Sequence, residues 1–295
     1  MKLPPFTLHR PDSVGRASRL LAELGDDGAA YCGGTELLLA MKLGLASYEH
    51  LVDLKRVDAL RGITPLPSGG VRIGAASTHR EIETSATLRA AYPELCAMIS
   101  RVANVRVRSV GTLGGNLCFA DPHSDPASFL LAADAVFACQ HGETIRRIPA
   151  ASFFTGLYET ALAPGELLTA VELPARPQRT GLSHLRFTLT ERPAVTVTAM
   201  LTLVQAGGAA TGVSEARLIV GSVGSVPFAA DTQILAGLLA GRAAADFEAR
   251  AEQCAGQAAA GCAPLPDGEA SVEYLRHLVF LYARQALRDA FARVS

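Results

Sequence analysis

The chain has 295 residues, of which 49% are hydrophobic and 19% are charged, and its mean hydropathy is +0.24. These values exclude a disordered or fibrous sequence, and at roughly 100–200 residues per domain they indicate two domains with separate cores. The 27 basic and 28 acidic residues nearly cancel. No basic field is available to hold a phosphate backbone, so nucleic acid is not an expected partner.

Targeting segments and metal sites receive no support from the sequence. The first residues lack the apolar stretch of a signal peptide, and the apolar runs are shorter than the roughly 18 residues of a membrane span. We therefore expect a cytoplasmic protein with no membrane contact. The cysteines are widely spaced and no pair has the CxxC spacing of a metal or redox site, which predicts separate reduced thiols and no metal or iron–sulfur site on this chain. They are Cys32, Cys96, Cys118, Cys139, Cys254 and Cys262.

The first part of the chain predicts mixed helices and strands. An apolar helical period indicates a helix over 14–24, which Gly25 ends, and Gly33-Gly34 separates a short strand from a second helix. The expected elements are helices over 14–24, 35–43 and 88–102, and strands over 29–32, 50–54, 71–75, 135–139, 144–148 and 167–173.

A linker over 174–181 marks the expected domain boundary, because its two prolines and polar residues continue neither a strand nor a helix. Strands are expected beyond it over 183–189, 195–204 and 216–220, followed by helices around 231–239, 246–260 and 271–290. Strands followed by helices indicate an α+β domain with helices on one face of an antiparallel sheet.

Two glycine-rich segments are candidate binding sites. Cys32-Gly33-Gly34-Thr35 lies between a strand and a helix, where glycines allow a ligand to approach backbone N–H groups. Gly111-Thr112-Leu113-Gly114-Gly115-Asn116 is expected to wrap a pyrophosphate through oriented N–H groups, and Asp125 can accept hydrogen bonds from a ribose. Taken alone, each segment is also consistent with a plain turn that binds no ligand. Neither matches the nicotinamide fingerprint or the P-loop, so another dinucleotide-binding architecture is needed.

With these segments in this order, the chain resembles the FAD-binding medium subunits of the molybdenum hydroxylases, the family of carbon monoxide dehydrogenase and bacterial xanthine dehydrogenases. The resemblance extends over nearly the whole chain. The segments that carry it are Cys32–Leu37, Ile73–His79, Val110–Asn116, Phe154–Leu168, Arg192–Val195 and Ser271–Arg276.

The resemblance implies an α+β fold: a two-subdomain FAD-binding domain of the vanillyl-alcohol-oxidase (PCMH) type, followed by an α+β C-terminal domain with an antiparallel sheet and helices. The expected boundaries are 1–176 for the FAD-binding domain, with subdomains of about 1–57 and 58–176, and 177–295 for the C-terminal flavoprotein domain.

Cofactor-binding positions also follow from the resemblance, whereas it implies no catalytic acid or base on this chain. Where many relatives have a lysine near the flavin, the best match here is Thr188, after Phe187. Cys32 replaces the usual alanine or glycine. The implied FAD-binding residues are Tyr31, Cys32, Gly33, Gly34, Thr35, Glu36, Leu37, Ala103, Gly111, Thr112, Gly114, Gly115, Asn116, Asp125, Leu168 and Thr188.

The implied function is electron transfer. Non-covalent FAD on this chain would receive electrons from [2Fe–2S] clusters on a small subunit and deliver them to NAD or another acceptor. The molybdenum cofactor would lie on a large subunit, and the assembly would be a dimer of heterotrimers. Arg106, Arg108 and Phe119 are expected on the partner surface.

Two alternatives remain open at this point. One is a stand-alone FAD-dependent oxidoreductase that acts on its own small-molecule substrate, for which His79, Tyr158 and Glu159 are the candidate bases. The other is a flavin-bearing assembly scaffold whose ring is inert, which the threonine at position 188 would suit. Single residues also have structural interpretations: His79 at a strand end and Cys118 in a core.

Overall fold

The computed structural model describes residues 2–206, 209–236, 243–266 and 270–294. The chain forms two compact units, one of Met1–Asp121 with Asp134–Ala175 and the other of Pro122–Ala133 with Arg176–Ser295. The chain thus passes from the first unit to the second between Ala175 and Arg176, within the expected linker. Residues 122–133 also belong to the second unit, although they precede that linker.

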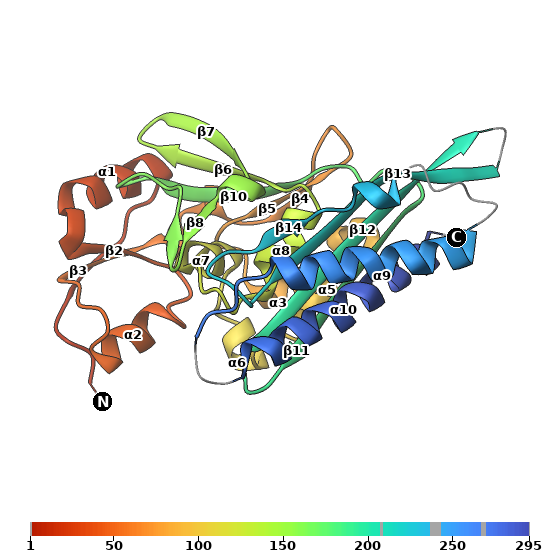
Figure 1. Cartoon of the computed structure of the whole chain (residues 1–295). Helices are drawn as coiled ribbons and strands as arrows, with labels where there is room; N and C mark the ends of the chain where they lie inside the picture. Colours follow the sequence, from red (N-terminus) through yellow and green to blue (C-terminus); the bar gives the residue numbers. More distant parts are fainter. Residues whose placement is uncertain (1, 207–208, 237–242, 267–269, 295) are drawn as a thin grey trace. The chain divides into compact units, whose positions relative to one another are not determined.

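The first unit contains two main sheets, labelled in Figure 1. β1, β3 and β2 form a parallel sheet in that order, β4-β5-β10-β6-β7 form an antiparallel sheet, and β8 pairs with β9. In chain order its elements are β1 (Thr7–His9), α1 (Val14–Leu24), β2 (Gly28–Tyr31), α2 (Leu37–Leu43), β3 (His50–Asp53), β4 (Ile63–Pro65), β5 (Val71–Gly74), α3 (His79–Thr84), α4 (Ala86–Ala91), α5 (Pro93–Ile99), α6 (Val105–Arg108), α7 (Leu113–Phe119), β6 (Val136–His141), β7 (Thr144–Pro149), β8 (Phe154–Gly156), β9 (Glu159–Thr160) and β10 (Leu167–Leu173).

Helix α1 joins the two sheets of this unit through a shared core. Ser13 caps the helix by accepting a hydrogen bond from the Arg16 N–H, and Gly25 ends it with a φ of 53°. Its buried face packs against β3 and the end of β10. The buried members of this core are Val14, Ala17, Val52, Leu54, Val57, Leu60, Ala76 and Leu167.

The expectation of a single helix over 88–102 is wrong, because the structure has two helices there. α4 ends at Ala91, and α5 begins at Pro93, which has no backbone N–H to continue the hydrogen bonds of α4. Tyr92 between them is buried, and its hydroxyl donates to the Pro174 carbonyl at 2.8 Å. The aromatic ring thus anchors the break between the helices.

The second unit is built on one antiparallel sheet in the order β11-β12-β13-β14. Its elements are α8 (Asp125–Ala132), β11 (Thr180–Thr188), β12 (Pro193–Ala206), β13 (Ala209–Gly221), β14 (Phe228–Ala230), α9 (Ala243–Gly261) and α10 (Val272–Ala292). Of the helix expected over 231–239, the structure has a 3₁₀ turn at Gln233–Leu235, and 237–239 lie outside the described residues.

Helices cover both faces of this sheet. Val195, Val197 and Ala199 of β12 pack in one core with residues of α9 and α10. Figure 1 shows these two helices lying along the sheet. The alternate residues Thr196 and Thr198 face α8. The expectation of helices on one face alone is therefore wrong, because it missed α8. That helix is buried almost all round, so its sequence carries no amphipathic period.

Candidate functional site

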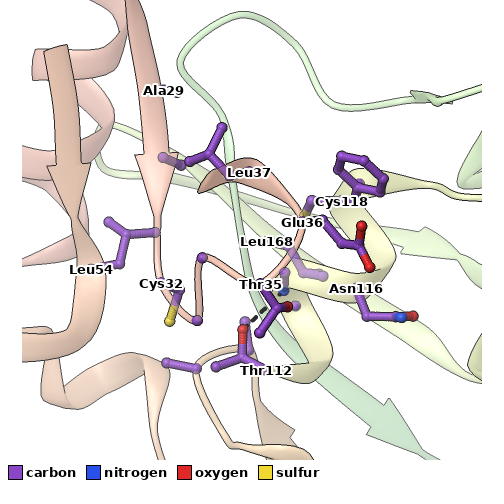
Figure 2. Close-up of a pocket in the computed structure, with 18 of the residues that line it drawn as sticks. Ala29, Cys32, Thr35, Glu36, Leu37, Leu54, Thr112, Asn116, Cys118 and Leu168 are labelled. Carbon is purple, nitrogen blue, oxygen red and sulfur yellow. Dashed lines mark hydrogen bonds between the residues drawn. The ribbon is translucent and has the colours of Figure 1, made fainter. Parts of the chain in front are cut away.

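A cavity of about 400 Å³ lies within the first unit. This volume is within the range of roughly 300–1,000 Å³ typical of ligand pockets. Both predicted glycine segments line it, and Figure 2 shows Thr35 and Thr112 from the two segments in the same close-up. The walls are completed by the strand ends of β5 and β10 and by the short helices α6 and α7.

The first glycine segment presents unpaired donors. The N–H groups of Gly33, Gly34 and Thr35 have no hydrogen-bond acceptor in the described part of the chain. Gly34 has a φ of +70°, a backbone conformation that residues other than glycine rarely adopt. A Cβ at this position would also meet the Tyr31 ring. The turn therefore requires glycine and leaves its backbone donors for a ligand.

Tyr31 supports this turn from outside the cavity. The Lys55 ammonium lies 3.6 Å from the centroid of the Tyr31 ring and 2.8 Å from a carboxylate oxygen of Asp53. Asp53 ends β3 directly beside Tyr31, because the two residues pair across the parallel sheet. The ring is thus fixed between Lys55 and Gly34.

The two glycine segments contact each other. A Cβ on Gly33 would meet the Val110 carbonyl and lie 2.8 Å from the Gly111 Cα. Burial raises the pKa of the Cys32 thiol and outweighs the opposing effects of the Thr112 hydroxyl, on the second segment, and of the Lys55 charge.

The second glycine segment uses its donors within the protein. The N–H groups of Leu113 and Gly114 donate to the carbonyls of Ser77 and Ala75, at 3.0 and 2.8 Å. That of Gly115 donates to the Thr112 hydroxyl at 3.1 Å, the bond dashed in Figure 2. The expectation that oriented N–H groups of this segment wrap a pyrophosphate is therefore wrong for these three groups. Those of Leu113 and Gly114 hold α7 against the residues that follow β5, and that of Gly115 caps the N-terminus of α7.

Gly114 serves this packing. A Cβ on Gly114 would lie 2.7 Å from both the Cβ and the carbonyl oxygen of Ala75. The space beside this glycine is filled by protein and is not part of the cavity. Glycine at position 114 is accordingly a requirement of the fold.

Arg108 has a structural position. Its guanidinium pairs with Glu83 at 3.1 Å and donates to the carbonyls of Val102 and Ala103, and its side chain is 12% exposed. The expected docking role of Arg108 does not suit a side chain with these partners. Arg108 instead holds the turn at Ala103, which has a φ of 44° and lines the cavity.

Glu166 is a cavity-lining carboxylate that the sequence analysis missed. Burial acts to raise its pKa, but hydrogen bonds from Arg146 and the Ala163 N–H, with the Arg146 charge, leave the pKa below its usual value. Both Arg146–Glu166 hydrogen bonds are 2.6 Å long. The carboxylate is therefore ionised at neutral pH, with its charge compensated by Arg146.

Most of the expected cofactor residues line this cavity. They are Cys32, Gly33, Gly34, Thr35, Glu36, Leu37, Ala103, Thr112, Gly114, Gly115, Asn116 and Leu168. Tyr31 and Gly111 lie directly behind this lining, as supports of Gly34 and Gly33. The lining residues that sequence reasoning missed include Ala75, Val102, Val107 and Leu162, which carry no chemical signal of their own.

Asp125 and Thr188 belong to the second unit, and their roles as cofactor contacts remain predictions. Asp125 is buried, with Arg186 donating to one carboxylate oxygen at 2.9 Å and His184 lying 3.5 Å from the other. Arg186 and Thr188 are two residues apart on β11, so their side chains lie on the same face of the strand. This cation beside Asp125 could not be expected from the sequence, because 61 residues separate the pair.

In the part of the chain that the structure describes, no group of three or more His, Cys, Asp and Glu side chains could hold a metal ion. Among the same residues, no helix combines the length and apolar character needed to cross a membrane.

Comparison with known proteins places this geometry in a family. Residues 4–176 match the model described as "FAD binding domain in molybdopterin dehydrogenase". The carbon monoxide dehydrogenase medium chain of Hydrogenophaga pseudoflava is 32% identical over 293 residues, 99% of each chain, and that of Afipia carboxidovorans is 31% identical over 98% of each.

The fold matches as well as the sequence. A solved carbon monoxide dehydrogenase structure from Hydrogenophaga pseudoflava superposes with a TM-score of 0.91 and 29% identity, over 100% of both chains. The expected mixed helix-and-sheet architecture, with antiparallel sheets in an FAD-binding domain, is confirmed. The chain belongs to the family of FAD-binding medium subunits of molybdenum hydroxylases, the flavoprotein subunits of multi-subunit oxidoreductases.

Proposed function

We propose that this chain binds FAD non-covalently in the cavity of the first unit and passes electrons from [2Fe–2S] clusters of a small partner subunit to NAD or another acceptor. A large partner subunit would carry the molybdenum cofactor and oxidise the substrate. The three chains would assemble as a dimer of heterotrimers. The organic substrate would be selected on the large subunit, outside this chain.

The observation that carries this proposal is the set of unpaired donors at the first glycine segment. The N–H groups of Gly33, Gly34 and Thr35 suit the oxygens of a pyrophosphate, which accept several hydrogen bonds from closely spaced backbone groups. Glycine at positions 33 and 34 leaves room for such an approach. The residues present therefore fit an FAD pyrophosphate.

The remaining lining supports the same cofactor. Ala75, Leu54 and Leu168 offer apolar surface for ring systems, and Thr35 and Asn116 offer polar side chains. FAD, when bound, supplies the ability to exchange either one electron or two. The contribution of this chain is to bind and orient the cofactor and to shield it from water. We assign no acid–base residue to it.

The domain roles follow from this assignment. We propose residues 1–176 as the FAD-binding domain, with subdomains of about 1–57 and 58–176, and 177–295 as the C-terminal flavoprotein domain. The proposal keeps Asp125 and Thr188 as candidate contacts from the second compact unit. Both can be tested by substitution once FAD binding has been measured.

The test is a titration of the purified apoprotein with FAD, followed by denaturation of the loaded protein. We expect one FAD per chain, with all flavin released on denaturation, because the binding is non-covalent. The chain alone should have little dehydrogenase activity, and co-expression with an iron–sulfur and a molybdenum subunit should restore turnover. Absence of FAD binding at micromolar concentrations would contradict the proposal. Robust turnover by the FAD-loaded chain alone would favour a stand-alone flavoenzyme.

A further inference from the structure

His79 is held rigidly beside the second glycine segment. It is the first residue of α3, whose N-terminus is closed by reciprocal hydrogen bonds between Thr78 and Glu81. The His79 N–H donates to the Gly111 carbonyl at 2.9 Å. A Cβ on Gly111 would lie 3.3 Å from the His79 Cδ2, so the imidazole packs directly against this glycine.

One imidazole nitrogen of His79 lacks a polar partner among the residues that the structure describes. His79 is 3% exposed and lines the cavity, yet its Nδ1 has no hydrogen-bond partner among the residues that the structure describes. The large majority of buried polar side-chain atoms are hydrogen-bonded, since an unsatisfied one loses its hydration without compensation. An unsatisfied imidazole in a cavity wall therefore points to a partner that the protein does not supply.

The ring is neutral under ordinary conditions. Burial, and then the charge of Arg108, lower the pKa of His79 to about 4. Arg108 is itself paired with Glu83. A neutral imidazole has one nitrogen that donates and one that accepts a hydrogen bond, so it can bind phosphate, hydroxyl or carbonyl groups without adding a charge to the site.

We propose that His79 is a cofactor-binding residue whose imidazole hydrogen-bonds the flavin nucleotide in the cavity. The inference rests on the proposed FAD-binding function and adds a contact from outside the two glycine segments. His79 then supplies a side-chain hydrogen bond next to a segment whose backbone donors are largely used within the protein.

Two properties of a His79→Leu variant separate this role from a structural one. Loss of the hydrogen bond should raise the FAD dissociation constant about tenfold, which corresponds to about 1.4 kcal/mol. The urea midpoint of the apoprotein should stay the same or rise, because the removed group satisfies no protein partner. His79→Asn retains polar atoms on a shorter side chain and should recover FAD affinity to within about threefold of the wild type. A structural histidine would give the reverse: a destabilised apoprotein with normal affinity.

The matched control is His141→Leu, because His141 is exposed at the end of β6 and does not line the cavity. It should leave FAD affinity unchanged. If His79→Leu does not fold, His79→Ala is measured in the same way. Wild-type FAD affinity in a folded His79→Leu or His79→Ala protein would overturn the inference and leave the proposed function intact. Absence of FAD binding by the wild-type protein would instead refute the proposed function.

Discussion

The two glycine segments of the cavity have similar compositions but different structural roles. In the first, the N–H groups of Gly33 and Gly34 have no acceptor among the residues that the structure describes. In the second, the donors of Leu113 and Gly114 are used by carbonyls near the end of β5. Glycine is needed in the first for a left-handed turn and in the second for close packing. A glycine-rich sequence alone therefore does not indicate which backbone groups reach a ligand.

The largest expected effect comes from Gly114→Val, which tests the packing role of the second segment. The new side chain would begin 2.7 Å from the Ala75 backbone, which is anchored in its turn by a hydrogen bond from the Ala75 N–H to the Thr169 carbonyl. We expect a loss of about 3 kcal/mol in the free energy of unfolding of the apoprotein, as for severe overpacking. Urea denaturation followed by circular dichroism measures it.

The control for this variant is Gly256→Val, because Gly256 lies on α9 with nothing within 4 Å of an added Cβ. It carries the same change of helix propensity without the clash. A stable Gly114→Val protein that had lost only FAD binding would show that position 114 faces the ligand, and it would remove the contrast between the two segments.

The next largest effect is expected for Gly34→Ala, with Gly44→Ala as its matched control. The two glycines flank α2 and have nearly equal φ values, +70° and +74°, so alanine should cost each about 1–2 kcal/mol of backbone strain. Only Gly34 has the Tyr31 ring beside it. We expect Gly34→Ala to raise the FAD dissociation constant at least tenfold, and Gly44→Ala to leave it unchanged. Equal affinities for the two variants would contradict the assignment of the first segment as the pyrophosphate site.

Local features of the site could be predicted from the sequence. The turn at Gly33 and Gly34 lies where a strand meets a helix, and its chemistry is determined by adjacent residues. The donors of the second segment could not be assigned, because their acceptors Ala75 and Ser77 lie more than 30 residues earlier in the chain. Only the folded structure brings these segments together.

The same limit explains other differences between sequence and structure. Arg108 lies close in the sequence to Arg101 and Arg106, a local basic cluster typical of a solvated surface, yet it pairs with Glu83, 25 residues away. Helix α8 has apolar residues on nearly all sides, and its polar contacts through Ser128 are made to β12, 68 residues later. Long-range partners of polar side chains were therefore the least predictable features, and periodic segments such as α1 and α10 were the most predictable.

A smaller effect is expected for Lys55→Met, which removes the cation from the Tyr31 ring behind the first segment. Cation–π contacts at partly exposed sites contribute about 0.5–1 kcal/mol, and the Lys55 side chain is 42% exposed. We expect the FAD dissociation constant to rise about two- to fivefold, since Tyr31 would support Gly34 less firmly. Lys42→Met on α2 is the control and should change nothing. An unchanged affinity in Lys55→Met would show that the turn holds its shape without this support.

The smallest expected effect is a difference in alkylation rate between two thiols, Cys32 in the first glycine segment and Cys118 just after the second. Cys118 lies on α7 and lines the cavity; the residue as a whole is exposed, but its thiol group is buried. Burial, and then the nearby Cys139, raise the pKa of Cys118 to about 12. Iodoacetamide reacts with the thiolate, so alkylation of Cys118 in the apoprotein should be very slow at pH 8.

The pH dependence separates Cys118 from an ordinary exposed cysteine. The Cys118 thiolate fraction rises about tenfold per pH unit well below the pKa, so alkylation should accelerate from pH 8 to pH 11 without reaching a plateau. Cys32 should react faster, because the Thr112 hydroxyl and the Lys55 charge oppose the effect of burial on its pKa. Mass spectrometry of the two peptides measures both rates, and Cys118→Ser identifies the signal. A plateau for Cys118 near pH 9 would mean that the wall at the second segment is open to water, and it would place the two segments in similar environments.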